Sequence, residues 1–101
     1  LYTLLNYPNP FKDNTVFTFW LLKEAEVEID IYTVGGRLIQ TLGPEYCTPT
    51  LGTPFYVYDN FHWDGRDRRG DKVANGTYLY KVKADFGDKT VSKIGRLVVM
   101  Q

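Results

Sequence analysis

The sequence predicts an all-β protein, an antiparallel β-sandwich of about seven strands. Apolar and acidic residues alternate strictly from Glu24 to Asp30, and successive side chains of a strand point to opposite faces. A helix over the same residues would spread the charges around its whole surface, so we reject that interpretation. Short apolar segments are also separated by turn-forming residues throughout, which is typical of a sandwich. Eight Tyr, six Phe and two Trp suit half-buried pleated surfaces.

The first two expected strands flank a segment rich in proline. Leu1 to Leu5 is expected to form a short strand. The two prolines in residues 6–11 remove amide donors, so this segment should lie extended along an edge of the sheet. We expect Tyr7 and Phe11 to attach it to the body of the domain. Residues 15–22 are apolar on both faces, which favours a central or covered strand.

A hairpin from Glu24 to Leu42 is expected to be the centre of the sandwich. Its turn contains Gly35 and Gly36, and glycine tolerates the positive φ that tight hairpins require. The returning strand runs over residues 37–42. Residues 43–54 contain three prolines, at positions 44, 49 and 54, and are expected to form a long loop.

Three further strands are expected after this loop. The first covers residues 55–63 and is followed by the most polar run of the chain, Asp64 to Lys72, whose aspartates and glycines favour Asx turns. The second covers residues 77–84. The last runs from Lys89 to Met100 and contains Gly95, where we expect a bulge or a kink.

Length and composition limit the possible functions. With 101 residues the chain has the size of one domain, and it lacks an initial Met, so we expect a single module of a larger protein with any export signal upstream. Twelve basic and twelve acidic residues cancel, which argues against nucleic acid as a partner. No stretch approaches the ~18 apolar residues of a membrane span, so no membrane insertion is expected. The single Cys47 is interpreted as a small apolar filler in a loop.

The acidic row on the first hairpin strand is the first candidate site. A metal site or a glycosidase would need carboxylates that face each other in a cleft, whereas these lie along one exposed strand face. Lysines on the later strands alternate in the same way, so we interpret both sets as cross-strand ion pairs on a solvated face. The acids are Glu24, Glu26, Glu28 and Asp30, and the lysines are Lys81, Lys83, Lys89 and Lys93.

Other polar and aromatic residues also favour structural interpretations. The aspartates of residues 64–71 lack the calcium-loop spacing and lie among arginines, so turn chemistry explains them better. His62 has no partners for a zinc site or a triad and is interpreted as a surface or packed structural histidine. Trp20 and Trp63 are interpreted as core anchors. Without a phosphate loop or a nucleophile motif, we expect no enzymatic activity and no cofactor.

Several segments in a fixed order resemble one family. Asn-Tyr-Pro-Asn-Pro-Phe opens the chain, Trp-Asp-Gly-Arg-Asp follows the middle strand, and Gly70 lies in the loop behind it. Together these segments are similar to the Ig-like domain of the flagellar hook-assembly protein. They resemble more closely the C-terminal sorting domains of the type IX secretion system of Bacteroidetes. The matching segments are residues 6–11, 27–39, 63–67, 74–80 and 93–100.

The resemblance implies an Ig-like signal module that directs its parent protein through the outer membrane. Such domains are recognised by the translocon and are usually removed by a sortase, which implies export through the periplasm to the cell surface or the exterior. We expect a monomer that presents a docking surface, with backbone edge recognition as the means of binding. The residues nominated for docking are Gly35, Gly36, Arg37, Gly76, Tyr78, Tyr80, Lys93, Leu97, Val98 and Val99.

Three alternatives remain open at this point. The chain is also similar to the retained C-terminal domain of the secretion-system sortase. A purely structural Ig-like spacer, as in the hook-assembly protein, would confer no secretion on a fused protein. A carbohydrate-binding accessory module would use exposed aromatic rings, for which Tyr56, Tyr58 and Trp20 are the candidates.

Overall fold

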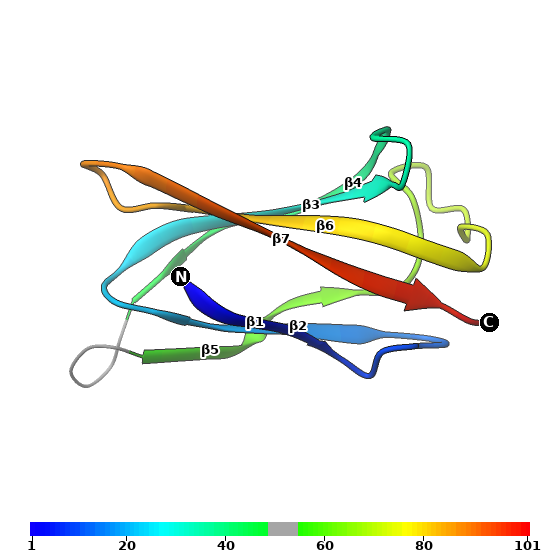
Figure 1. Cartoon of the computed structure of the whole chain (residues 1–101), viewed down its shortest axis with the longest axis horizontal. Helices are drawn as coiled ribbons and strands as arrows, with labels where there is room; N and C mark the ends of the chain where they lie inside the picture. Colours follow the sequence, from blue (N-terminus) through cyan, green and yellow to red (C-terminus); the bar gives the residue numbers. More distant parts are fainter. Residues whose placement is uncertain (49–54) are drawn as a thin grey trace.

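The computed structural model describes residues 1–48 and 55–101, which form an Ig-like sandwich of two antiparallel sheets (Figure 1). The described residues contain no helix, and so none that could span a membrane. This architecture confirms the predicted fold class. The strands are β1 (Tyr2–Tyr7), β2 (Thr15–Leu21), β3 (Ala25–Thr33), β4 (Leu38–Cys47), β5 (Phe55–Trp63), β6 (Gly76–Asp85) and β7 (Thr90–Val99).

The strand order separates the elements into a three-stranded sheet, β1-β2-β5, and a four-stranded sheet, β4-β3-β6-β7. β2 is the middle strand of its sheet, as its two apolar faces predicted. The β3–β4 hairpin is central only in part, because β3 lies between β4 and β6 whereas β4 is an edge strand. The prediction that the whole hairpin forms the centre is therefore wrong for β4.

The core lies between the sheets and is built from alternate residues of each strand. Phe17 of β2 meets Tyr80 of β6 across the sandwich, with ring centroids 4.8 Å apart and edge-to-face geometry. Trp63 is buried beside Tyr78, with ring centroids 6.0 Å apart, which confirms Trp63 as a core anchor. Trp20 is not one. The odd-numbered residues of β2 face the core, so Trp20 lies half-buried on the outer face of its sheet.

The proline segment before β2 lies along the end of β7. The backbone N–H of Phe11 donates to the carbonyl of Val98 at 3.0 Å, and the N–H of Met100 donates to the carbonyl of Phe11 at 2.9 Å. Because Phe11 is also buried, its predicted attachment role is confirmed. The same prediction is wrong for Tyr7, which is 78% exposed. Tyr7 lies opposite Val16, whose side chain is on the outer face of the sheet, so the Tyr7 side chain also faces outward.

The prediction of a loop over residues 43–54 is wrong for residues 43–47, because β4 continues to Cys47. Between the pairs Ile29–Leu42 and Val27–Glu45, β3 advances by two residues and β4 by three. This bulge takes up Gly43, whose φ is +84°, and the proline after it, which an edge strand tolerates. Residues 49–54 lie outside the described residues.

Cys47 is therefore the last residue of an edge strand and does not lie in a loop. Its side chain is buried, as expected of an apolar filler. Burial, with a smaller contribution from the charge of Glu45, raises the pKa of its thiol to about 11. At neutral pH the thiolate is scarce, which argues against a reactive cysteine.

Gly95 does not form the predicted bulge or kink. The pairing of β6 with β7 is unbroken from Gly76–Val99 to Asp85–Thr90. Gly95 lies opposite Tyr80, and a Cβ added to it would be 2.5 Å from Cζ of the tyrosine ring. Glycine is required there because the ring packs against the backbone of β7.

Replacing Gly95 with Ala is expected to lower the free energy of unfolding by about 1–3 kcal/mol, because the added methyl group overlaps a ring that is buried and cannot move aside. Urea denaturation measures the difference. Gly35→Ala is the matched control, because the nearest atom to its added Cβ is 3.9 Å away. We expect the control to change stability by less than ~0.5 kcal/mol. Equal losses in both variants would contradict the steric explanation.

Candidate functional site

The acidic row of β3 forms ion pairs with β6 on the outer face of the four-stranded sheet. Nζ of Lys83 lies 2.8 Å from Oε2 of Glu28 and 3.1 Å from Oδ2 of Asp30. This confirms the predicted cross-strand pairing for Lys83. The expectation of a fully solvated row is wrong at Asp30, which is only 4% exposed because β3 has neighbours on both sides. Three other lysines make no ion pair within the described residues: Lys81, Lys89 and Lys93.

Asp30 is held in its ionised form. Burial alone would raise the pKa of its carboxyl group, but hydrogen bonds from Lys83 and Thr41, together with the charge of Lys83, outweigh burial and keep the pKa below the usual 3.8. Hydrogen bonds to Glu28 and, to a smaller extent, to Asp30 raise the pKa of Lys83. A carboxylate with a lowered pKa and fixed partners is suited to a structural role and not to proton transfer.

The aspartates of the polar loop shape its backbone. Oδ1 of Asp64 accepts a hydrogen bond from the N–H of Arg66 at 3.1 Å. Oδ1 of Asp67 accepts from the N–H groups of Arg69 and Asp71, at 2.9 and 3.1 Å. These Asx turns confirm the predicted turn chemistry. Across residues 1–48 and 55–101, no three acidic, histidine or cysteine side chains gather as metal ligands would.

Four aromatic rings form a row on the outer face of the three-stranded sheet. Ring centroids are 6.5 Å apart between Tyr2 and Trp20, 5.1 Å between Trp20 and Tyr56, and 5.8 Å between Tyr56 and Tyr58. Trp20 and Tyr56 therefore have a neighbouring ring on both sides. Tyr56 and Tyr58 are nonetheless exposed to solvent, by 40% and 64%. His62, on the same strand as Tyr56, is exposed, so of the two structural positions expected for it the surface one is correct.

The turn between β3 and β4 carries three of the nominated docking residues. The N–H of Gly36 donates to the carbonyl of Thr33 at 2.9 Å, and the N–H of Arg37 donates to Oγ1 of Thr33 at 3.0 Å. Gly36 has φ of +96°, as the glycine pair predicted. Together with Gly35, these residues lie at the end of the sandwich that also holds the polar loop and the C-terminus (Figure 1).

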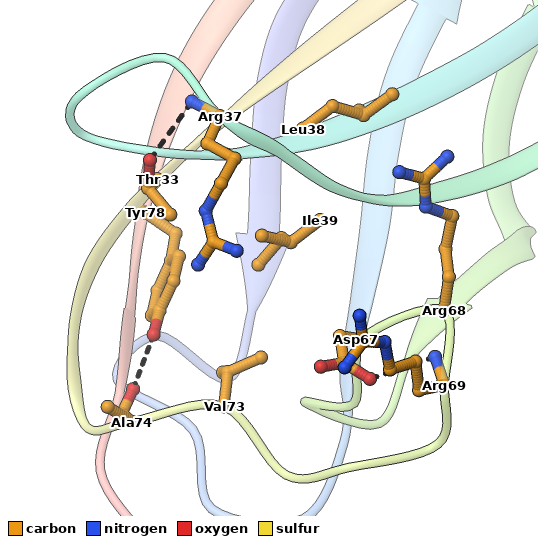
Figure 2. A pocket seen from close by; sticks show the side chains of 10 residues that line it. All are labelled: Thr33, Arg37, Leu38, Ile39, Asp67, Arg68, Arg69, Val73, Ala74 and Tyr78. Carbon is orange, nitrogen blue, oxygen red and sulfur yellow. Dashed lines mark hydrogen bonds between the residues drawn. The ribbon is translucent and has the colours of Figure 1, made fainter.

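At this end of the sandwich the structure brings Arg37 and Tyr78 to one hollow of about 370 Å³ (Figure 2). The Tyr78 hydroxyl donates to the carbonyl of Ala74 at 2.7 Å. Burial raises the pKa of Tyr78, although the positive charge of Arg37 acts in the opposite direction. The hollow is lined by Thr33, Arg37, Leu38, Ile39, Asp67, Arg68, Arg69, Val73, Ala74 and Tyr78.

Sequence reasoning missed Arg68 and Arg69 as residues of this hollow. In the sequence they stand out only as arginines among the aspartates of a turn. Their position depends on a contact between distant segments, in which the N–H of Arg68 donates to the carbonyl of Ile39 at 3.1 Å. No local pattern marks such a contact.

The remaining nominated residues do not share that hollow. Three have buried side chains that face the core and are not available to a partner: Tyr80, Leu97 and Val99. Gly76 begins β6 with φ of +146° and is exposed, as is Lys93 on β7. Val98 is half-buried, and its N–H donates to Oδ1 of Asn9 at 2.9 Å. The ten residues therefore divide between the β3–β4 turn, β6 and β7.

The outer edge of β7 is covered at one end and open at the other. Val98 directs its N–H and its carbonyl away from β6, toward Asn9 and Phe11. Because the pairing with β6 is regular, Ser92 and Ile94 direct their backbone groups the same way. Among the described residues, none accepts or donates a hydrogen bond to these two backbones on that side.

Neither a protein-family model nor a curated protein matches the chain. Two solved structures from Porphyromonas gingivalis are similar to it. Dimeric latent PorU has a TM-score of 0.75 and 24% identity, over 96% of this chain and 9% of that one. PorZ, an essential bacterial surface component of the type-IX secretion system, has a TM-score of 0.59 and 25% identity, over 98% of this chain and 12% of that one.

These similarities confirm the Ig-like fold and the resemblance to domains of the type IX secretion system. The similarity to PorZ supports a role connected with type IX secretion. The chain spans about a tenth of the length of each neighbour, so the activities of those whole proteins are not transferred to it.

Asp30→Asn is expected to lower the free energy of unfolding by about 1 kcal/mol near pH 7, and the difference should shrink as the pH falls. The pKa of Asp30 is lower in the folded than in the unfolded protein, so its contribution is complete above the unfolded pKa and disappears as the pH falls through the folded pKa. Urea denaturation from about pH 7 to about pH 3 measures this. Glu26→Gln, on the same strand but exposed, is the control and should change little. A difference that does not depend on pH would contradict the assignment.

Proposed function

We propose that this chain is a non-enzymatic C-terminal signal and docking domain, which directs its parent protein through the outer membrane by type IX secretion and to the cell surface. The similarity to PorZ over 98% of the chain is the observation that carries this proposal. Residues 1–101 act as one monomeric module of a larger protein, and its partners are components of the translocon and the sortase.

The open edge of β7 is the docking surface that the geometry favours. An extended segment of a translocon component adds to this edge as a further strand, between Thr90 and Gly95. The backbone bonds of such a strand supply affinity with little dependence on sequence, which suits a module attached to different parent proteins. Ile94 lies on this part of β7 with its side chain 66% exposed and offers an apolar contact beside the backbone bonds.

The other three edges of the sandwich are less regular, and β5 is irregular between Val57 and Phe61. β4 is interrupted by the bulge at Gly43 and by Pro44. β1 is irregular between Tyr2 and Leu5, where Thr3 has φ of +55°. Bulges and prolines protect sheet edges from pairing, and β7 has neither between Thr90 and Val99.

Attaching residues 1–101 to the C-terminus of a periplasmic reporter, in a host with a working type IX system, is expected to place the reporter on the cell surface. Surface labelling of intact cells measures display, and mass spectrometry of the displayed reporter determines whether the module is removed or kept. A reporter that stays in the periplasm, although the module is folded, would contradict the signal function and favour the structural spacer.

Ser92→Pro is expected to reduce display by about tenfold or more, because proline removes the outward N–H while the bonds between β7 and β6 remain. Ser92→Ala keeps that N–H and is the matched control, with normal display expected. Deleting residues 93–101 is a weaker test, because it also removes Leu97 and Val99 from the core. Normal display of a folded Ser92→Pro variant, or equal loss in both variants, would contradict docking at this edge.

A further inference from the structure

The hollow at the end of the sandwich gathers three arginines from two segments that are distant in the sequence. Arg37 extends from the β3–β4 turn beside Tyr78 and Ile39, and Arg69 extends from the polar loop toward the same space (Figure 2). Arg68 also belongs to the lining of the hollow. The chain as a whole has no net charge, so this concentration of positive charge is local.

The three guanidinium groups are available to a ligand. None of them forms an ion pair with the residues that the structure describes. The one carboxylate in the lining, Asp67, already accepts two backbone hydrogen bonds through Oδ1. All three arginines are exposed.

The walls of the hollow are held in place before any ligand binds. The carbonyl of Arg66 accepts from Nε1 of Trp63 at 2.8 Å and from Nε2 of Gln40 at 3.2 Å. The N–H of Asp67 donates to the carbonyl of Asp71 at 2.9 Å, and the N–H of Arg68 donates to Ile39. Since the loop is tied both to the core and to β4, a ligand would not have to order it.

The chemistry of the lining indicates the kind of ligand. Guanidinium groups bind carboxylates and phosphates through paired hydrogen bonds. Ile39, Val73 and Tyr78 supply apolar surface beneath them. A volume of about 370 Å³ lies at the small end of the range for small-molecule sites, and a single sugar ring fits it. We propose that this hollow binds an oxyanion, a carboxylate or a phosphate, borne on a ligand of about monosaccharide size.

This site is separate from the docking edge of β7, so either proposal can fail without the other. The test is a titration of the ¹⁵N-labelled chain, followed by NMR, with sodium glucuronate, inorganic phosphate and neutral glucose. We expect glucuronate to give saturable shifts at Arg37, Arg68 and Arg69, and glucose to give none. If phosphate shifts the same signals as strongly, the oxyanion alone is recognised. If glucuronate binds more tightly, the ring contributes as well.

Arg69→Gln is expected to weaken glucuronate binding by about tenfold, because it removes the charged hydrogen bonds but leaves the shape of the loop unchanged. Arg96→Gln is the matched control, because Arg96 is an exposed arginine of β7 outside the hollow, and binding should be unchanged. The amide spectrum of each variant verifies its fold. The proposal is overturned by equal shifts with glucose, by equal weakening in both variants, or by no saturable shift up to roughly 50 mM of either anion.

Discussion

The packing of Tyr80 between the two sheets is the interaction on which the rest of the molecule depends. Its ring meets Phe17 of the opposite sheet and lies against the backbone of β7, where Gly95 leaves room for it. Burial raises the pKa of its hydroxyl to about 12, so the group is neutral at physiological pH. From β6, this one side chain therefore contacts β2 of the opposite sheet and β7 of its own sheet.

Aromatic residues of the same core also hold the polar loop at the end of the sandwich. Two residues before Tyr80, Tyr78 packs on Trp63 and binds the carbonyl of Ala74. Trp63 in turn donates to the carbonyl of Arg66. The core aromatics thus hold both ends of the polar loop. A loop that composition alone would describe as solvated and variable is therefore fixed against β4, and its arginines face a defined space.

The two proposed functions use different properties of the fold. The edge of β7 offers backbone groups in a regular row, partly covered by residues 9–11, and it suits partners that contribute an extended strand. The hollow offers charged side chains on a rigid frame and suits a small anion. Neither requires a reactive group, and the Asp30–Lys83 pair belongs to the structural part of the molecule. Both the β7 edge and the hollow are formed by the module itself. The module can therefore be attached to parent proteins of unrelated activity.

Alternation with a period of two, together with the turn residues, was sufficient to predict the fold class, most strand positions and the Asx turns, because these features depend on neighbours along the chain. Which strand lies beside which is a non-local property that the sequence does not display. The burial of Asp30, the outward position of Trp20 and the continuation of β4 to Cys47 all follow from strand order. The meeting of Arg37 with Arg68 and Arg69 has the same origin, because a sheet brings together residues about thirty positions apart only after its strands have paired.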